Sequence, residues 1–133
     1  MFPANDPNAV RQMYMTEEAL RVRQETHDRY SSPPTDFVGW ALNCVDWRGD
    51  ETILDVGCGP GRWYETIQKK LPDAAYYGLD LHSGMLRNHP GRDYLTIGDA
   101  QQLPYPDGYF DVVMANHMLF HVQDANAAIQ EFH

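Results

Sequence analysis

A short apolar run at residues 52–56 leads directly into a turn with three glycines in five residues, at 57–61. The β-branched and aliphatic residues of the run predict a buried strand, and residues 62–71 suit a helix. Glycines let a backbone approach a ligand closely, and the first turn of the following helix offers unpaired N–H groups to a polar end of that ligand. We therefore expect a ligand-binding turn here, with the carboxylate of Asp55 pointing into the same crevice.

The spacing of these glycines separates two classes of α/β protein. Nicotinamide-dependent oxidoreductases use G-x-G-x-x-G, in which the third glycine packs the helix on the strand. The present spacing is Gly-Cys-Gly-Pro-Gly, with Trp63 or Tyr64 at the position of that third glycine. An acidic residue before the first glycine is also no part of the oxidoreductase pattern. We therefore disfavour an oxidoreductase, while a tight turn in some other α/β protein stays open.

Strands and helices alternate along the chain. We expect further strands at residues 74–80, 93–98 and 109–115, the last of them fully buried, and helices at residues 16–30 and 36–45, from Ser83 and from Asp124. Such alternation predicts a parallel sheet with right-handed crossovers, whose ligands bind beyond the carboxyl ends of the strands. Residues 1–13 predict a loose lead-in, so we assign residues 1–34 to a lead-in and helix and residues 35–133 to the ligand-binding domain.

The helix expected at residues 36–45, capped by Thr35 or Asp36, carries apolar residues at helical spacing. They are Phe37, Trp40, Ala41, Cys44 and Val45. Cys44 is therefore most simply a core residue. Cys44 and Cys58 are the two cysteines of the chain, and they predict no disulfide framework.

Acidic residues dominate the charge, because 19 Asp and Glu against 10 Lys and Arg give a formal net charge of −9 at pH 7. Such a surface repels phosphate backbones, so a nucleic-acid partner is disfavoured. No apolar run approaches the roughly 18 residues of a membrane span, and the first residues lack a signal-peptide pattern. We therefore expect no membrane span and a cytoplasmic protein.

Asp80 ends the second expected strand, 25 residues after Asp55. A carboxylate at this place can accept hydrogen bonds from both vicinal hydroxyls of a ribose. The alternative is an N-cap for the helix that begins near Ser83. After a glycine turn on the preceding strand we favour the ribose role. Met85 in that helix lies either against an adenine face or in the core.

Four segments together resemble the motifs of the class I methyltransferases that use S-adenosylmethionine. They are LDVGCGPG at 54–61, YGLD at 77–80, GDAQQLP at 98–104 and FDVV at 110–113, in the family's order and spacing. The resemblance covers about residues 27–133 and points to the small-molecule branch, which includes quinone-biosynthesis C-methyltransferases. It implies a Rossmann-like α/β fold, S-adenosylmethionine as cofactor and S-adenosylhomocysteine as product.

The resemblance also implies the residues around the methionine part of the cofactor. Three glycines, Gly57, Gly59 and Gly61, would let the backbone approach it. Asp55 would lie near its amino group, directly or through water, and Asn116 would offer that group its backbone carbonyl. Tyr30 stands where relatives close the site over the carboxylate.

At the other end of the cofactor, Asp80 would hold the ribose hydroxyls. Asp99 would accept a hydrogen bond from the adenine amino group, and the Ala100 N–H would reach a ring nitrogen. Further contacts are expected from Cys58, Leu81, Met85 and Gln101.

Methyl transfer from a sulfonium depends mainly on aligning the reacting atoms, and a base is needed only if the acceptor must lose a proton. Our candidates are His121 and, after it, His117, which follow the fourth strand. The alternative for each histidine is a residue that only packs or hydrogen-bonds in its loop. Their spacing of four residues also occurs in metal pairs, but no H-E-x-x-H glutamate and no third ligand are evident, so we expect no metal.

One departure from the family lies at residues 131–133, where its members continue into strands five to seven. We therefore expect an incomplete sheet of order 3-2-1-4, a truncated cofactor-binding half. The leading function is methyl transfer to a small-molecule acceptor, and the alternative is a non-catalytic S-adenosylmethionine-binding or interaction module. An exposed strand edge at 109–115 and an under-packed last helix predict a homo-oligomer with contacts in residues 109–133.

Overall fold

The computed structural model describes residues 5–32 and 36–133 and has a four-stranded parallel sheet at its centre. The strands are β1 (Thr52–Val56), β2 (Ala75–Asp80), β3 (Leu95–Ile97) and β4 (Val112–Met114), in the order β3-β2-β1-β4. In the middle of the sheet, Asp55 of β1 is in register with Gly78 of β2 and with Met114 of β4. The predicted α/β class and strand order are confirmed.

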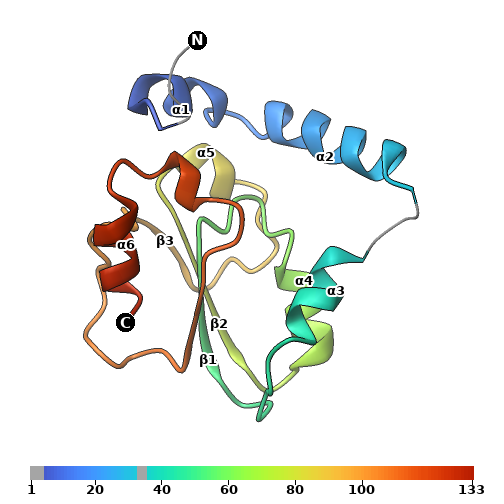
Figure 1. Cartoon of the computed structure of the whole chain (residues 1–133). Coiled ribbons are helices and arrows are strands. Elements are labelled where there is room, and N and C mark those ends of the chain that lie inside the picture. The colour runs from blue at the N-terminus through green and yellow to red at the C-terminus, as the bar shows by residue number, and fades with distance from the viewer. Residues whose placement is uncertain (1–4, 33–35) are drawn as a thin grey trace.

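The helices form two layers around this sheet and a third group at one end of it (Figure 1). They are α1 (Pro7–Met13), α2 (Glu18–Tyr30), α3 (Phe37–Leu42), α4 (Tyr64–Lys70), α5 (Ser83–Leu86) and α6 (Ala125–Glu131), with a 3₁₀ turn η1 (Leu119–His121). Helices α3 and α4 lie on one side of the sheet and α6 on the other, while α1 and α2 lie across its upper end (Figure 1). Among the described residues no helix is long and apolar enough to cross a membrane.

Alternation along β1 builds a core on each face of the sheet. Ile53 is fully buried against α3 and α4, where Ile67 belongs to the same cluster. Leu54 and Val56 point to the opposite face and pack in a second cluster with Ala128 of α6. Because both faces of β1 are covered, apolar side chains lie on both sides of the strand, and its one acid, Asp55, is buried as well.

The lead-in expected at residues 1–13 is wrong for the part that the structure describes, because residues 7–13 form α1. The Asp6 carboxylate accepts hydrogen bonds from the backbone N–H groups of Asn8 and Ala9, and Pro7 occupies the first helical turn. An aspartate before a proline is a helix-start signal, since it caps two free N–H groups and fixes φ for the first turn. The proline content of this segment suggested a loop, although the Asp6–Pro7 pair is a helix start.

The apolar face expected for residues 36–45 is also wrong in part. Helix α3 ends at Leu42, and its buried side chains are Val38 and Leu42, one turn apart. Trp40 is exposed, and so is Cys44, which lies beyond the helix end and is not a core residue. The Asp36 carboxylate caps α3 by accepting from Gly39 N–H, whereas Thr35 and the expected domain boundary lie outside the described residues.

The fourth strand is shorter and less buried than predicted. Only residues 112–114 pair with β1, and all three are half-buried. An edge strand has a partner on one side alone, so its apolar sequence does not guarantee burial. The Asp124 cap of α6 is confirmed by the bond that its side chain accepts from Ala127 N–H.

Candidate cofactor site

A cavity of about 740 Å³ lies between the carboxyl ends of the strands and the helices α1 and α2. This volume is within the range of about 300–1,000 Å³ that small-molecule sites occupy. Most of the predicted site residues line it, namely Gly57, Cys58, Gly59, Asp80, Leu81, Met85, Asp99, Ala100, Gln101, Asn116, His117 and His121. Three of the predicted residues, Tyr30, Asp55 and Gly61, are not part of its lining.

The glycine turn after β1 forms the floor of the cavity. Gly57 and Gly59 have φ of +70° and +55°, which side-chain-bearing residues rarely adopt. The N–H groups of Gly57 and Cys58 both donate to the carbonyl of Leu79, at 2.7 and 3.1 Å. The turn is thereby fastened to the end of β2, and burial raises the pKa of the Cys58 thiol, which stays neutral at physiological pH.

Asp80 stands at the carboxyl end of β2 with its carboxylate held from two sides. One oxygen accepts from Gly59 N–H at 3.0 Å and the other from His82 N–H at 2.9 Å. Burial raises the pKa of this carboxyl group, while both backbone N–H bonds counteract the rise. Each oxygen keeps acceptor capacity toward the cavity, which is what binding a vicinal diol requires.

Asp99, Ala100 and Gln101 form a second polar corner after β3. The Asp99 carboxylate accepts from the backbone N–H of Gln101 at 2.9 Å and from its side-chain amide at 3.1 Å. The Gln101 amide oxygen in turn accepts from Asp124 N–H at 2.9 Å. These bonds fix the corner against the start of α6.

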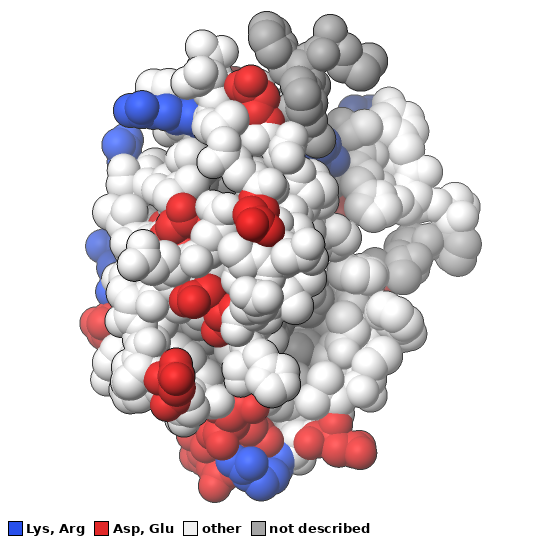
Figure 2. Space-filling view, turned by 60° about the vertical axis from the view of Figure 1, so that its left-hand side comes forward, with Lys and Arg blue, Asp and Glu red and all other residues white. Residues whose placement is uncertain are grey.

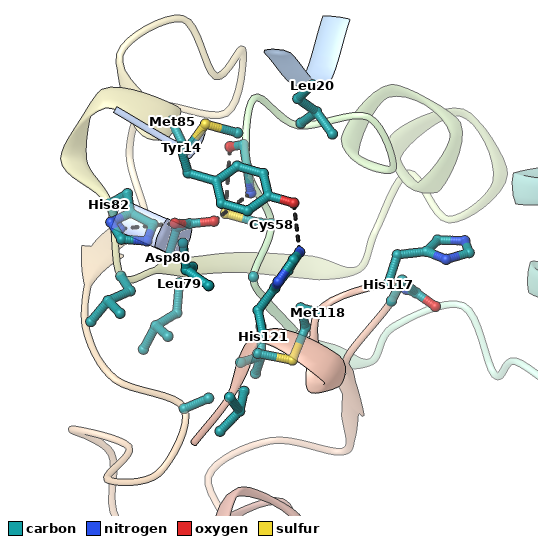
Figure 3. A pocket seen from close by; sticks show the side chains of 18 of the residues that line it. Tyr14, Leu20, Cys58, Leu79, Asp80, His82, Met85, His117, Met118 and His121 are labelled. Carbon is teal, nitrogen blue, oxygen red and sulfur yellow. Dashed lines mark hydrogen bonds between the residues drawn. The ribbon is translucent and has the colours of Figure 1, made fainter. Parts of the chain in front are cut away.

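After β4 the chain turns through Asn116 and His117 into η1. His117 has a φ of 55°, and its ring lies 5.2 Å from that of Phe37. His121 instead points toward α1, where its Nε2 lies 2.7 Å from the hydroxyl of Tyr14 (Figure 3). The two histidines therefore diverge, and no group of three metal-ligating side chains is found in the described part of the chain.

Asp55 lies beneath the glycine turn rather than in the crevice, so its predicted direction is wrong. Its side chain is 1% exposed and accepts a 2.9 Å bond from the Tyr76 hydroxyl. Tyr76 also lies 3.2 Å from Nε2 of His89, whose Nδ1 accepts from Gly91 N–H. Because Nδ1 is an acceptor, Nε2 carries the proton of a neutral imidazole and donates to Tyr76. Burial lowers the pKa of His89 and raises that of Asp55 to about 7.

Gly61 and Tyr30 also lie away from the cavity lining. Gly61 has a φ of +87°, and a Cβ there would lie 2.8 Å from Nε2 of His89, so the glycine is required by packing. Tyr30 is the last residue of α2 and is 74% exposed, with the Arg29 guanidinium 5.8 Å from its ring. Its side chain does not reach the cavity in this conformation.

Two groups of lining residues escaped the sequence analysis. Tyr14 binds His121 and also stacks on His82, with ring centroids 6.1 Å apart. His82 Nε2 and Asn116 Nδ2 are buried, and neither has a hydrogen-bond partner within residues 5–32 and 36–133. The second group is one face of α2, described below. The Tyr14–His121 contact spans 107 residues and leaves no local signal in the sequence, and α2 has no buried residue that would mark its cavity side.

Helices α1 and α2 are seated over the cavity by several contacts. Besides the Tyr14–His121 bond, the Asn88 amide donates to Glu17 at 3.0 Å. A Cβ at Gly84 of α5 would lie 2.4 Å from the backbone oxygen of Met15, so the segment between α1 and α2 lies directly against α5. The cavity is thus enclosed from above.

This arrangement suits a nucleoside-bearing ligand. Gly57 and Gly59 let the backbone approach a ligand, and the Asp80 carboxylate is held in a fixed position. The buried Nδ2 of Asn116, which has no hydrogen-bond partner in the described residues, is available to donate to a ligand. Asp99 and the Ala100 backbone provide an acceptor and a donor at the far corner. The residues present therefore fit S-adenosylmethionine.

Comparison with known proteins agrees with this geometry. A family model described as a methyltransferase domain matches residues 54–133, more than half of the chain. An uncharacterised methyltransferase of Schizosaccharomyces pombe is 29% identical over 75% of this chain and 49% of its own length. Demethylmenaquinone methyltransferase of Geobacillus kaustophilus is 34% identical over 60% of this chain and 38% of its own length.

Among solved structures, a Methanococcus maripaludis protein provisionally assigned as an S-adenosylmethionine-dependent methyltransferase superposes with a TM-score of 0.66. The two are 21% identical, and the superposition covers 88% of this chain and 57% of the other. At that identity the likeness concerns the fold. The chain spans half or less of the length of the two curated relatives named above.

Proposed function

We propose that this chain, which belongs to the methyltransferase domain family, binds S-adenosylmethionine in the cavity above the sheet and transfers its methyl group to a small-molecule acceptor. Family membership confirms the predicted class I methyltransferase and S-adenosylmethionine as its cofactor. The observation that carries the proposal for this chain is the Asp80 carboxylate, held by two backbone N–H groups at the edge of the cavity.

In this proposal each corner of the cavity holds one part of the cofactor. Asp80 accepts hydrogen bonds from the ribose hydroxyls, and Asp99 and Ala100 bind the adenine edge. The glycine turn and Asn116 lie along the methionine part. When bound, S-adenosylmethionine supplies a methyl group that the positive charge of its sulfur already activates. The residues of the chain then act by positioning the cofactor and the acceptor and by excluding water from the cavity.

His121 is the proposed base for an acceptor that must lose a proton. Its ring lines the cavity and is oriented by the Tyr14 hydroxyl at 2.7 Å. His117 lines the cavity too, but it stands beside Phe37 on the other side of the pocket (Figure 3). Orientation by a neighbouring group is what a base requires, so His121 remains the first choice.

The nature of the acceptor is proposed from the relatives and from charge. The named activity of the Geobacillus kaustophilus relative acts on demethylmenaquinone, a small molecule. The net charge of −9 opposes a nucleic-acid acceptor. We further propose a cytoplasmic location and self-association through the open edge of β4.

Replacement of Asp80 by alanine tests the cofactor site. Loss of its charge-assisted bonds to the ribose should weaken S-adenosylhomocysteine binding about tenfold or more, measured by calorimetry. Because Asp80 also holds the glycine turn, Asp80→Asn serves as a second variant, which keeps the oxygen that accepts from one N–H. Asp107→Ala, which removes an exposed acid from the loop before β4, is the matched charge control.

Circular dichroism of each variant shows whether the sheet is retained. Unchanged affinity in both folded Asp80 variants would remove the ribose assignment. Tighter binding of NAD than of S-adenosylhomocysteine by the unaltered chain would contradict the proposed function. Transfer of labelled methyl to candidate acceptors distinguishes a catalytic chain from a module that only binds the cofactor.

A further inference from the structure

One face of helix α2 lines the cavity and carries basic and polar side chains. Its members are Leu20, Arg23, Gln24 and His27, at the i, i+3, i+4 and i+7 spacing of a single helical face. The acidic residues of the same helix, Glu18, Glu25 and Asp28, do not line the cavity. Helix α2 has no buried residue, so this face does not serve a hydrophobic core.

Arg23 has no carboxylate partner in the described part of the chain. Its guanidinium donates to the sulfur of Met13 at 2.9 Å, a weak acceptor that a ligand can replace. Arg21 on the same helix pairs with Glu25 at 2.7 Å instead. Arg62, which also lines the cavity, lies 3.9 Å from Asp28. Of the two arginines in the described lining, Arg23 is therefore the one without a carboxylate within ion-pair distance.

Another part of the cavity lining is aromatic. The ring of Phe37 meets that of Trp63 edge-on at 6.0 Å and that of His117 at 5.2 Å. All three line the cavity, and Trp63 is only 6% exposed. Such rings provide a flat apolar contact for another planar group. We call these rings, together with Arg23, His27 and Arg62, the basic compartment.

Acidic and basic side chains both line the cavity. The only acidic side chains in its described lining are Asp80 and Asp99, both in the half that fits the ribose and adenine. Asp80 and His117 lie on opposite sides of the pocket (Figure 3). The outer surface differs, because acidic side chains are scattered over the face in Figure 2 while basic ones lie toward its edges. In a chain of net charge −9, the exposed basic side chains of this compartment indicate charge complementarity to an anionic ligand.

We infer that the basic compartment binds a planar aromatic acceptor that carries a negative charge, such as a carboxylate or phenolate. This inference rests on the proposed function, because it treats the compartment as the acceptor side of the same cavity. Arg23 meets the anionic group, and the rings of Phe37, Trp63 and His117 meet the face of the acceptor. A guanidinium suits this task because its planar fork matches a carboxylate.

The test compares 2-naphthoate with 2-naphthamide, which have the same shape and differ in charge. Both are titrated into the 133-residue chain by ligand-observed NMR, with and without saturating S-adenosylhomocysteine. We expect the unaltered chain to prefer the naphthoate by about fivefold or more, the effect of one charge-assisted contact at a partly exposed site. Arg23→Gln should reduce this preference to about twofold or less, by the same reasoning.

Arg21→Gln is the matched control, because Arg21 lies on the same helix with its charge already paired to Glu25. It should retain the full preference for naphthoate. Arg62→Gln should reduce the preference less than Arg23→Gln, since Asp28 offsets part of the Arg62 charge. Equal affinity of the unaltered chain for the two probes, or an equal effect of the Arg21 and Arg23 substitutions, would overturn the inference.

The affinity for S-adenosylhomocysteine is measured in the same variants, because this molecule also carries a carboxylate. If Arg23→Gln weakens its binding and leaves the naphthoate preference intact, the cation serves the cofactor and the inference is wrong. If S-adenosylhomocysteine does not bind even to the unaltered chain, the proposed function fails. The comparison of the two naphthalene probes without it still decides whether the compartment selects anions.

Discussion

Replacing Asp55 by asparagine should make the stability of this protein less dependent on pH. The Asp55 carboxyl is 1% exposed, and burial raises its pKa from 3.8 to about 7 despite the bond from Tyr76. Between these values the folded state binds a proton that the unfolded state has lost. Stability therefore falls as pH rises through this window and is level above it, as far as this group is concerned.

The size of the effect follows from the width of the window. Between pH 5 and pH 7, about 2 pH units at about 1.4 kcal/mol each give a loss of about 3 kcal/mol in the free energy of unfolding. Asparagine cannot ionise, and its amide oxygen can still accept the Tyr76 hydroxyl. The variant should therefore gain about 3 kcal/mol relative to the unaltered chain between pH 5 and pH 8.

Urea unfolding followed by circular dichroism at several pH values measures this difference. Titrating groups remote from Asp55 contribute equally to both proteins and cancel in the comparison. Tyr76→Phe is the informative control, because it removes the donor to Asp55 and leaves the ring in place. Without that donor the pKa of Asp55 rises further, so the loss of stability should continue above pH 7.

A constant difference between the Asp55→Asn variant and the unaltered chain from pH 5 to pH 8 would refute the reasoning. It would mean that Asp55 has the same pKa folded and unfolded. Binding of S-adenosylhomocysteine by the same variant tests the role that the family resemblance implies. Retained affinity is expected here, since the carboxylate lies beneath the glycine turn and outside the cavity lining.

Two further predictions concern the backbone and the sheet edge. Gly57 and Gly108 both have a φ of +70°, but only at Gly57 would a Cβ meet a neighbour, at 2.8 Å. Gly57→Ala should therefore cost about 2–4 kcal/mol in thermal unfolding and Gly108→Ala about 1–2 kcal/mol, and equal losses would contradict the contact. For the β4 edge, light scattering at micromolar concentration should give a mass above the monomer's 15.3 kDa, whereas a monomer would exclude pairing at that edge.

The sheet was predictable because its signals are local. Three of the four strands are short apolar runs that end at a glycine or an aspartate, and alternation with helices determines a parallel sheet. The glycine turn and Asp80 therefore meet at one end of the sheet without knowledge of any long-range contact. The failures in the same region have a different origin. Asp55 has the right sequence position, but the face on which its side chain lies depends on Tyr76 and His89, from two other segments.

Helices α1 and α2 were harder to predict because they contribute to the cavity lining and not to the core of the sheet. Helix α2 has no buried residue, so no apolar stripe marks the side that it turns toward the cavity. The face that lines the cavity is mostly polar. Sequence alone does not distinguish Arg23, which lines the cavity, from Arg21, which pairs with Glu25. Tyr14 meets His121 across 107 residues, and nothing near either residue in the sequence announces the contact.

Asp55 and Asp80 lie near the carboxyl ends of neighbouring strands, and burial raises the pKa of both carboxyl groups, that of Asp55 to about 7. Asp80 accepts from two backbone N–H groups, which favour its ionised form, whereas Asp55 accepts from a single phenol in a site closed to water. The negative charge of Asp80 itself contributes to the raised pKa of Asp55. Asp55, with a single donor and 1% exposure, is therefore the carboxyl group whose ionisation the fold disfavours more. The two fixed N–H donors therefore favour a negative charge on Asp80, the carboxylate that we propose to bind the ribose.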